Sequence, residues 1–254
     1  MLKSGLKKLI QLSGFDVVRY QEPAASPFPP DFEPRDIEIL RAVAPYTMTS
    51  PERLFALVQA VRYVVQGDIP GALVECGVWR GGSVMAAALA LLQMNREDRA
   101  LYLFDTFEGM SSPDEQDVTL HGEAASAILQ NPEHPRFRNV FAYATLDEVR
   151  ANVQQTGYDQ ANIHFIQGKV EDTIPEQAPE TIALLRLDTD WYESTKHELE
   201  YLFPRLSPHG VLIIDDYGHW RGCRRATDEY FARENLPILL NRIDYTGRIA
   251  VKQG

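Results

Sequence analysis

Short apolar runs alternate along this chain with stretches in which apolar residues recur every three or four positions. The first pattern is typical of buried β-strands and the second of amphipathic helices. Runs of the first kind occupy residues 72–77, 100–105, 162–167, 181–188 and 210–215. Their alternation with helical sequence predicts an α/β fold built on a doubly wound parallel sheet.

Two further apolar runs, at residues 237–240 and 248–252, follow the last of these strands and are joined near Gly247. Two late strands connected in this way suit an antiparallel, hairpin-like edge. We therefore predict a seven-stranded, mostly parallel sheet.

The region before the first strand has a different pattern. Residues 23–34 contain five prolines and are predicted to form an extended arm. After this arm, Ser50 and Pro51 suit a helix N-cap and a first helical position, and the apolar residues that follow share one helix face. We predict an N-terminal arm and helical cap over residues 1–66 and the sheet domain over residues 67–254.

The first ten residues combine three lysines with Leu2, Leu6, Leu9 and Ile10. They lack the uninterrupted apolar core and the small-residue cleavage site of a signal peptide. We interpret them as a docked surface helix or a frayed terminus. Binding to a membrane surface is the alternative.

Residues 107–157 interrupt the alternation of strands and helices with several prolines and glycines. Long insertions at the carboxyl ends of parallel strands often form lids or substrate walls. We predict a lid over about residues 107–157, with an inert surface loop as the alternative.

Charge and cysteine content narrow the class of protein. Lys and Arg number 25 against 36 Asp and Glu, a formal net charge of −11, which disfavours a nucleic-acid partner. The two cysteines cannot form a disulfide framework, and no Cys/His cluster suggests zinc. No apolar run is long enough to span a bilayer, so we expect no integral membrane association and a cytoplasmic location.

The first candidate site is the sequence Glu-Cys-Gly-Val-Trp-Arg-Gly-Gly-Ser at residues 75–83, where a strand passes into a helix. Glycines there let the backbone turn tightly and approach a ligand. Their spacing is not that of a dinucleotide pyrophosphate site. S-adenosylmethionine has no phosphate, and its ammonium group would favour an acidic partner such as Glu75. A plain glycine turn is the alternative.

Asp105 ends the second predicted strand. An acidic residue at that position can accept hydrogen bonds from both hydroxyls of a ribose, as it does in NAD sites. Asp105 therefore indicates a ribose and does not choose between cofactors. A helix cap is the alternative role.

Three aspartates decide the reaction class. Asp188 ends one strand, and Asp215 and Asp216 end the next. If these strands are neighbours, three carboxylates meet at one sheet edge and need a cation or protons to offset their repulsion. An all-oxygen set selects a hard cation, Mg²⁺ first, with Ca²⁺ or Mn²⁺ possible. The alternative has these acids capping helices or pairing with arginines at 186, 221 or 224.

A divalent cation would give a hydroxyl group the acidity that methyl transfer requires, because it lowers the pKa of an oxygen that it binds. A neighbouring carboxylate could then take the proton. Among the histidines His219, three residues after Asp216, is the best placed as another base. His121 and His134 fall in the predicted lid and are interpreted as surface residues.

Four ordered motifs carry a resemblance to a known family: the sequence at 75–83, Phe-Asp-Thr-Phe-Glu-Gly-Met at 104–110, Leu-Arg-Leu-Asp-Thr-Asp-Trp-Tyr-Glu-Ser-Thr at 185–195, and Ile-Ile-Asp-Asp-Tyr-Gly at 213–218. They resemble the macrocin O-methyltransferase family, whose members include enzymes that methylate sugar hydroxyls of macrolide and aminocoumarin antibiotics. The resemblance covers about residues 46–250.

The resemblance implies a class I methyltransferase fold, a hydroxyl-bearing small-molecule acceptor and a homodimer or larger homo-oligomer. It implies Mg²⁺ held by Asp188, Asp215 and Asp216, with Asp188 also as the base, and Met48 reaching over the methyl group of S-adenosylmethionine. Core packing is the alternative role for Met48. The residues assigned to the cofactor are Met48, Glu75, Gly77, Trp79, Arg80, Gly81, Ser83, Asp105, Thr106 and Gly168.

This chain departs from the family at two positions of the third motif. The family often has Gly where this chain has Thr189, and a smaller apolar residue where it has Trp191. We expect Trp191 to reshape the acceptor pocket, so the acceptor is not carried over from the family. Two rival functions are a non-catalytic nucleotide or sugar-nucleotide binding module and an NAD-dependent dehydrogenase.

Overall fold

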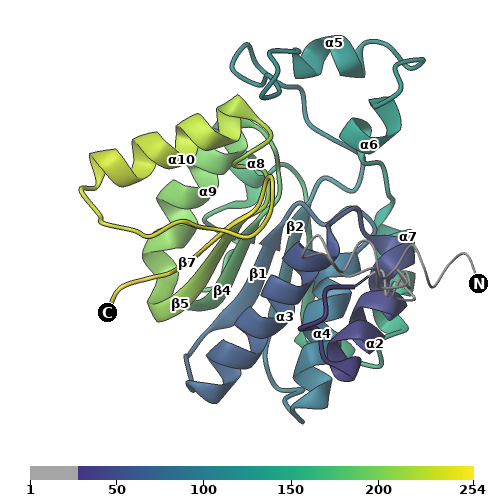
Figure 1. The fold of residues 1–254 in the computed structure, drawn as a ribbon, viewed down its shortest axis with the longest axis vertical. Coiled ribbons are helices and arrows are strands. Elements are labelled where there is room, and N and C mark those ends of the chain that lie inside the picture. The colour runs from purple at the N-terminus through teal and green to yellow at the C-terminus, as the bar shows by residue number, and fades with distance from the viewer. Residues whose placement is uncertain (1–27) are drawn as a thin grey trace, which may run out of the picture. The chain divides into compact units, whose positions relative to one another are not determined.

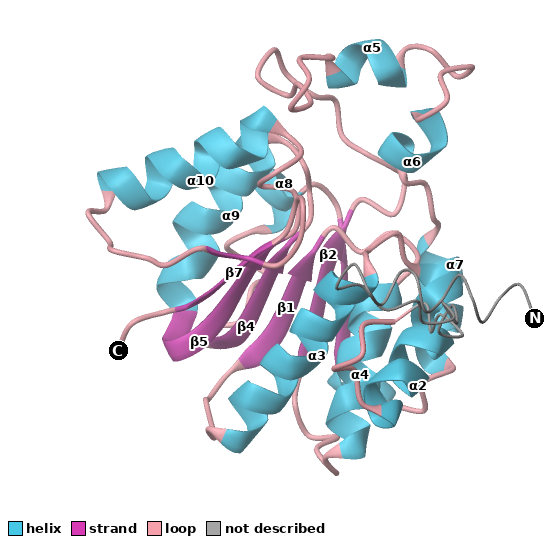
Figure 2. Ribbon diagram, viewed as in Figure 1, coloured by secondary structure: helices cyan, strands magenta, loops and turns pink. Residues whose placement is uncertain are grey.

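Seven strands form one sheet in the order β3-β2-β1-β4-β5-β7-β6 in the computed structural model, which describes residues 28–254 (Figure 2). The strands are β1 (Ala72–Cys76), β2 (Leu101–Asp105), β3 (Ile163–Gln167), β4 (Ile182–Leu187), β5 (Leu206–Ile214), β6 (Asn241–Arg242) and β7 (Arg248–Val251). Strands β1 to β5 pair in parallel, whereas β7 is antiparallel to both β5 and β6. The predicted doubly wound, mostly parallel sheet of seven strands is therefore confirmed.

The chain order reverses between β1 and its neighbour β4, at the middle of the sheet. In open α/β sheets, ligands bind beyond the carboxyl ends of the strands at such a reversal. Strands β1 and β4 are buried along their whole length, which explains their continuous apolar sequence.

Helices cover both faces of the sheet (Figure 1). One layer contains α2 (Pro34–Val43), α3 (Pro51–Gln66), α4 (Gly82–Gln93) and α7 (Leu146–Gln154). The other contains α8 (Val170–Thr173), α9 (Tyr192–Leu202) and α10 (Arg221–Arg233). Short 3₁₀ turns lie at η1 (Ala44–Tyr46), η2 (Gln160–Asn162) and η3 (Phe203–Arg205).

Helix α3 begins as the sequence predicts. The Ser50 side chain accepts a hydrogen bond from the Arg53 backbone N–H, and Pro51 takes the first helical position. The apolar face at Leu54, Leu57, Val58 and Val61 is buried. Residues Glu33–Gly254 form one compact unit, which includes α2 and α3. The predicted surface helix at residues 1–10, and most of the predicted proline-rich arm, lie outside the described residues.

The first strand of the terminal hairpin differs from the prediction. It occupies Asn241–Arg242, and residues 237–240 run without ladder pairing. Ile238 and Leu240 pack against the core while Leu239 is 82% exposed, so the alternation is real. The ladder to β7 includes only Asn241, opposite Ile249, and Arg242, opposite Arg248.

The predicted lid segment divides into two parts. Helix α7 packs against α4 and belongs to a covering layer. The preceding part carries the short helices α5 (Ala125–Leu129) and α6 (Phe137–Phe141) and projects beyond the carboxyl ends of the strands (Figure 1). Its entry is fixed to the sheet domain, because Asp117 accepts the Tyr192 backbone N–H at 2.8 Å.

Cys76 and Cys223 are both buried and free of disulfides. Within residues 28–254, no helix is long and apolar enough to cross a membrane.

Candidate active site

Two adjoining cavities open at the carboxyl ends of β1, β4 and β5. The glycine-loop cavity, of about 730 Å³, is lined by Met48, Gly77, Trp79, Phe104, Asp105, Thr106, Gly109, Met110, Ser111, Asn139, Ala142, Gly168, Lys169, Val170, Glu171, Asp188, Thr189, Asp190 and Ser194. The acidic cavity, of about 920 Å³, is lined by Tyr46, Thr47, Met48, Thr49, Arg53, Glu75, Val78, Trp79, Gly82, Ser83, Arg136, Asn139, Val140, Asp188, Asp190, Asp215, Asp216, His219 and Trp220. The residues common to both are Met48, Trp79, Asn139, Asp188 and Asp190.

The glycine-loop cavity is shaped mainly by backbone conformation. Gly77 has a φ of +82°, and a Cβ atom there would collide with the backbone carbonyl of Asp188. Gly168 has a φ of +144°, in the region that side chains rarely adopt. The turn therefore lets β1 and β4 approach each other closely, and a ligand can lie against main chain.

Asp105 holds this turn together. Its carboxylate accepts hydrogen bonds from the backbone N–H groups of Val78 at 2.6 Å, Trp79 at 3.1 Å and Phe107 at 2.7 Å. It caps none of the helices in the described residues, and it lines the glycine-loop cavity beside Thr106. Asp105 is thus placed where a ribose hydroxyl could reach it, while it also fixes the loop.

Glu75 lies in the acidic cavity, and so does Ser83 at the start of α4. Glu75 is 6% exposed and accepts a hydrogen bond of 2.6 Å from Arg186 Nη1. Burial raises the pKa of Glu75 to about 7, against the opposing effect of Arg186. The ammonium group of a bound ligand beside Glu75 would therefore stabilise the charged carboxylate of Glu75. The N-terminus of α4 suits a carboxylate group of the same ligand.

Arg80 and Gly81 line neither cavity, although the sequence assigns them to the cofactor. Arg80 pairs with Glu148 at 2.6 Å and donates to the Pro45 carbonyl at 2.8 Å. A Cβ atom at Gly81 would press on valines of α7. Both residues hold the glycine turn against α7 and the α2–α3 connection.

Met48 lies at the rim shared by the two cavities, and 46% of it is exposed. The Thr49 backbone N–H donates to the Thr47 hydroxyl at 3.0 Å, and the Thr49 hydroxyl accepts from Arg186 at 3.1 Å. The exposure of Met48 argues against the alternative of ordinary core packing.

Asp188, Asp215 and Asp216 each offer one carboxylate oxygen within 4.8 Å of the others. Burial raises the pKa of Asp188 well above its ordinary value, with Asp215 and Asp216 adding to the rise while Arg186 opposes it. Burial also raises the pKa of Asp216, helped by Asp190. Like charges at this spacing are stable only with protons or a cation.

The three carboxylates fit a divalent cation by their chemistry, because hard cations prefer oxygen ligands. Asp216 also has a buried oxygen, Oδ2, with no hydrogen-bond donor in the described part of the chain. Asp190 lies beside them, and burial raises its pKa to about 7. Asp188, Asp215 and Asp216 therefore offer ligands to a cation, and Asp190 is a fourth acid beside them.

Two arginines face the same acids. Arg186 pairs with Asp188 at 2.7 Å and with Asp215 at 2.8 Å, as the alternative interpretation of the sequence expected for this arginine. Arg53 also pairs with Asp215. Arg221 and Arg224 do not pair with these acids: Arg221 donates to the Leu120 carbonyl and Arg224 pairs with Asp228.

His219 lies in the acidic cavity, and its Nδ1 is 3.0 Å from the Tyr245 hydroxyl. Burial and Arg136 lower the pKa of His219, so the neutral ring can accept a proton. His121 is exposed and His134 contacts Glu123 at 3.0 Å, and neither lines a cavity.

Trp191, which the sequence predicts to reshape the acceptor pocket, lines neither cavity. It is 2% exposed, packs edge-on against Trp220 at 5.0 Å, and donates from Nε1 to the Ser111 carbonyl at 3.0 Å. Since Trp220 lines the acidic cavity, Trp191 contacts a residue of the cavity wall and not the cavity itself.

Sequence reasoning missed Arg53, Asp190 and Asp244. Asp190 lies in a motif that was recognised and could have been found from its distance of two residues from Asp188. Arg53 is 162 residues from Asp215 and lies on a helix assigned to the cap, so no local pattern signals its role.

Comparison with known proteins gives the family. The model of the macrocin O-methyltransferase (TylF) family matches residues 19–251. The chain is 36% identical to the 8-demethyl-8-(2,3-dimethoxy-α-L-rhamnosyl)-tetracenomycin-C 4′-O-methyltransferase of Streptomyces olivaceus, over 86% of this chain and 80% of that protein. It is 34% identical to demethyldecarbamoylnovobiocin O-methyltransferase of Streptomyces niveus, over 80% of this chain and 74% of that protein.

A solved structure agrees with these relatives. The O-methyltransferase NovP superposes with a TM-score of 0.70 and 32% identity, covering 82% of this chain and 83% of that chain. An O-methyltransferase assignment replaces the two rival functions, a binding module and a dehydrogenase. The chain belongs to the macrocin O-methyltransferase family and is an O-methyltransferase.

Proposed function

We propose that this enzyme transfers the methyl group of S-adenosylmethionine to a hydroxyl group of a sugar-containing natural product, with a divalent cation, Mg²⁺ first, at Asp188, Asp215 and Asp216. The observation that carries the proposal is the position of Asp188. It belongs to the carboxylate cluster and lines both cavities, so a cofactor that extends from the glycine-loop cavity into the acidic cavity and an acceptor in the acidic cavity would meet beside it.

The glycine-loop cavity suits the adenosine part of the cofactor, with Asp105 and Thr106 beside the ribose. Glu75 and Ser83 then hold the ammonium and carboxylate ends in the acidic cavity. Met48, at the rim of both, lies over the sulfonium. S-adenosylmethionine supplies a methyl group that is already electrophilic, so the protein contributes mainly orientation.

A divalent cation supplies the charge that makes an acceptor hydroxyl more acidic. Asp188 takes the hydroxyl proton as the oxygen forms its bond to the methyl carbon and the sulfur–carbon bond breaks. Arg186 keeps the Asp188 carboxylate oriented through its contact of 2.7 Å. His219, in the same cavity, is the alternative base.

The acceptor class follows from the relatives and from the walls of the acidic cavity. The names of two relatives specify rhamnosyl-tetracenomycin and novobiocin compounds. The acidic cavity is lined by aspartates and by Trp220, a combination that suits a ring that has hydroxyl groups on its edge and an apolar face. We therefore propose the sugar of a glycoside as the acceptor.

The test is mass spectrometry of the enzyme incubated with S-adenosylmethionine, Mg²⁺ and a library of hydroxylated glycosides, each paired with its sugar-free aglycone. We expect a gain of one methyl group on the sugar of some glycosides and on none of the aglycones. The gain should be lost with EDTA and restored by Mg²⁺. Methylation of aglycones alone would contradict the sugar acceptor, and full turnover in EDTA would contradict the metal.

The two-part domain division, the homodimer or larger homo-oligomer and the cytoplasmic location stay predictions. Light scattering of the purified protein would test the predicted oligomeric state.

A further inference from the structure

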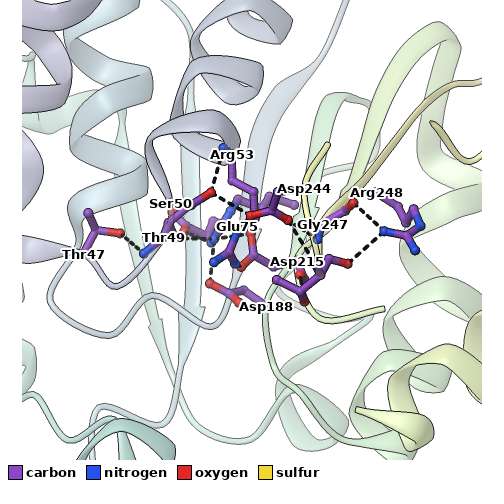
Figure 3. Close-up of polar contacts among 12 residues, drawn as sticks. Thr47, Thr49, Ser50, Arg53, Glu75, Asp188, Asp215, Asp244, Gly247 and Arg248 are labelled. Atoms are coloured by element: carbon purple, nitrogen blue, oxygen red, sulfur yellow. Dashed lines mark hydrogen bonds and ion pairs between the residues drawn. The ribbon is translucent and has the colours of Figure 1, made fainter. Parts of the chain in front are cut away.

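Arg53 reaches the acidic cavity from α3 and lies between two carboxylates of distant elements (Figure 3). Its Nη1 pairs with Asp215 at the end of β5, and its Nε donates to Asp244 Oδ2 at 3.0 Å, in the turn between β6 and β7. The side chain is 13% exposed. A partly buried arginine with two anionic partners has a well-defined position.

The turn at Asp244 is built to hold that position. Asp244 accepts the Ser50 hydroxyl at 2.7 Å and the backbone N–H groups of Thr246 at 2.9 Å and Gly247 at 2.8 Å. A Cβ atom at Gly247 would collide with the aliphatic stem of Arg53. The guanidinium is therefore fixed by its partners and by the close approach of the turn.

Asp215 is shared between two arginines. Arg186 holds Oδ1 at 2.8 Å, and Arg53 holds Oδ2. The two arginines differ in their surroundings, because Arg186 is 3% exposed and has three carboxylate partners, in β1 and just after β4 and β5, whereas Arg53 lines the cavity. Both oxygens of one candidate metal ligand are thus already engaged by cations.

We propose that Arg53 is a resident cation that competes with the divalent ion for Asp215 and so sets the metal affinity, with Asp244 as the residue that positions it. This inference rests on the metal site of the proposed function. A fixed positive charge beside a carboxylate cluster repels a divalent ion and occupies one of its ligands. Arg53 therefore keeps the affinity of the site below what three carboxylates alone would give.

The test is calorimetric titration of the cofactor-free protein with Mn²⁺ and with Mg²⁺, which needs no turnover. Arg53→Met should bind either ion more tightly, by about tenfold or more, because a single charge is lost near the site. Arg53→Lys keeps the charge and should stay within about threefold of the wild type. Arg53→Gln provides a second neutral variant if Arg53→Met does not fold.

Arg96→Met is the matched control. It removes one positive charge from the amino side of β2, where Arg96 pairs with Asp98, and should leave metal affinity unchanged. A merely structural role for Arg53 predicts weaker binding in both neutral variants. If the wild type binds metal and the neutral variants bind it equally or more weakly, the inference about Arg53 is wrong, while the proposed metal site stands. If neither the wild type nor these variants bind, the proposed metal site fails as well.

Asp244→Asn tests the positioning role through a double-mutant cycle with Arg53→Met. If Asp244 acts through Arg53, its substitution changes metal affinity in the wild-type background and has a clearly smaller effect once Arg53 is replaced. An equal change in both backgrounds would show that Asp244 acts only through its own charge, and would remove it from the proposal.

Discussion

The two cavities of this site are built in different ways. The glycine-loop cavity is shaped by glycines with left-handed backbone angles and by one carboxylate, Asp105, that accepts backbone N–H groups. The acidic cavity is lined by four aspartates, Arg53 and Arg136, and Arg186 on β4 pairs with two of those aspartates. Local backbone conformation therefore determines the first, and a balance of charges between distant segments determines the second. A substitution should affect one cavity with little effect on the other, except at the residues that they share.

Asp188 is shared by both cavities, and its substitution should have the largest effect. Asp188→Asn keeps the shape but removes the proposed base and a charged metal ligand. The turnover number at saturating metal should fall by roughly 10²–10⁴-fold, as is typical for a lost general base. Binding of S-adenosylhomocysteine, measured by calorimetry, should change much less. If Asp188→Asn stays active, His219 becomes the preferred base, and His219→Gln is the next variant to measure.

Asp105 should affect the glycine-loop cavity more than the acidic one, although Val78 and Trp79, whose N–H groups it accepts, also line the acidic cavity. Asp105→Ala removes charged hydrogen bonds to the loop and to a ribose, so the affinity for S-adenosylhomocysteine should fall by about tenfold or more. Metal affinity should stay at the wild-type value. Asp159→Ala, which removes an exposed acid before β3, is the matched control. Unchanged cofactor affinity in a folded Asp105→Ala protein would remove Asp105 from the site.

The projecting part of the lid segment contributes to both cavities through α6, because Asn139 lines each of them. S-adenosylhomocysteine with Mg²⁺ should therefore slow tryptic cleavage after the exposed Arg138 by several-fold. Cleavage after Arg233, at the end of α10, serves as the internal control. Equal rates at Arg138 with and without ligand would contradict closure of the segment over the site.

The smallest effect concerns pH and the entry to the lid. Burial raises the pKa of Asp117 from 3.8 to about 6. The folded state then binds this proton more tightly than the unfolded state, so the stabilisation is complete below about pH 4 and is lost as pH rises through 6. Between pH 4 and 7 the melting temperature of Asp117→Asn should fall less than that of the wild type, by on the order of 2 °C. Parallel curves for the two proteins would assign the pH dependence to other groups.

The sequence predicted the sheet because each buried strand is a short apolar run, and such a run can be recognised without knowing the rest of the fold. It also placed Asp188, Asp215 and Asp216 together, since the ends of neighbouring parallel strands must meet. It could not find Arg53 or Asp244, which reach the site only after α3 and the β6–β7 turn pack against β5. It could not show the direction of the Trp191 side chain for a related reason. A residue inside a motif can point away from the cavity, and the contacts of Trp191 with Trp220 and the Ser111 carbonyl give its direction only in the folded structure.

The close approach at Gly77 has a consequence for how enzymes of this kind can diversify. Because any larger residue there would push against the main chain of Asp188, a single codon change at Gly77 would damage cofactor binding and proton transfer together. The residues of the catalytic centre should therefore change little during evolution, whereas Trp191, Trp220 and the residues of α6 take no part in this close approach and can vary more freely. New acceptors should arise through mutations in this outer shell, and a library directed at those positions should yield more active enzymes than one directed at the strand ends.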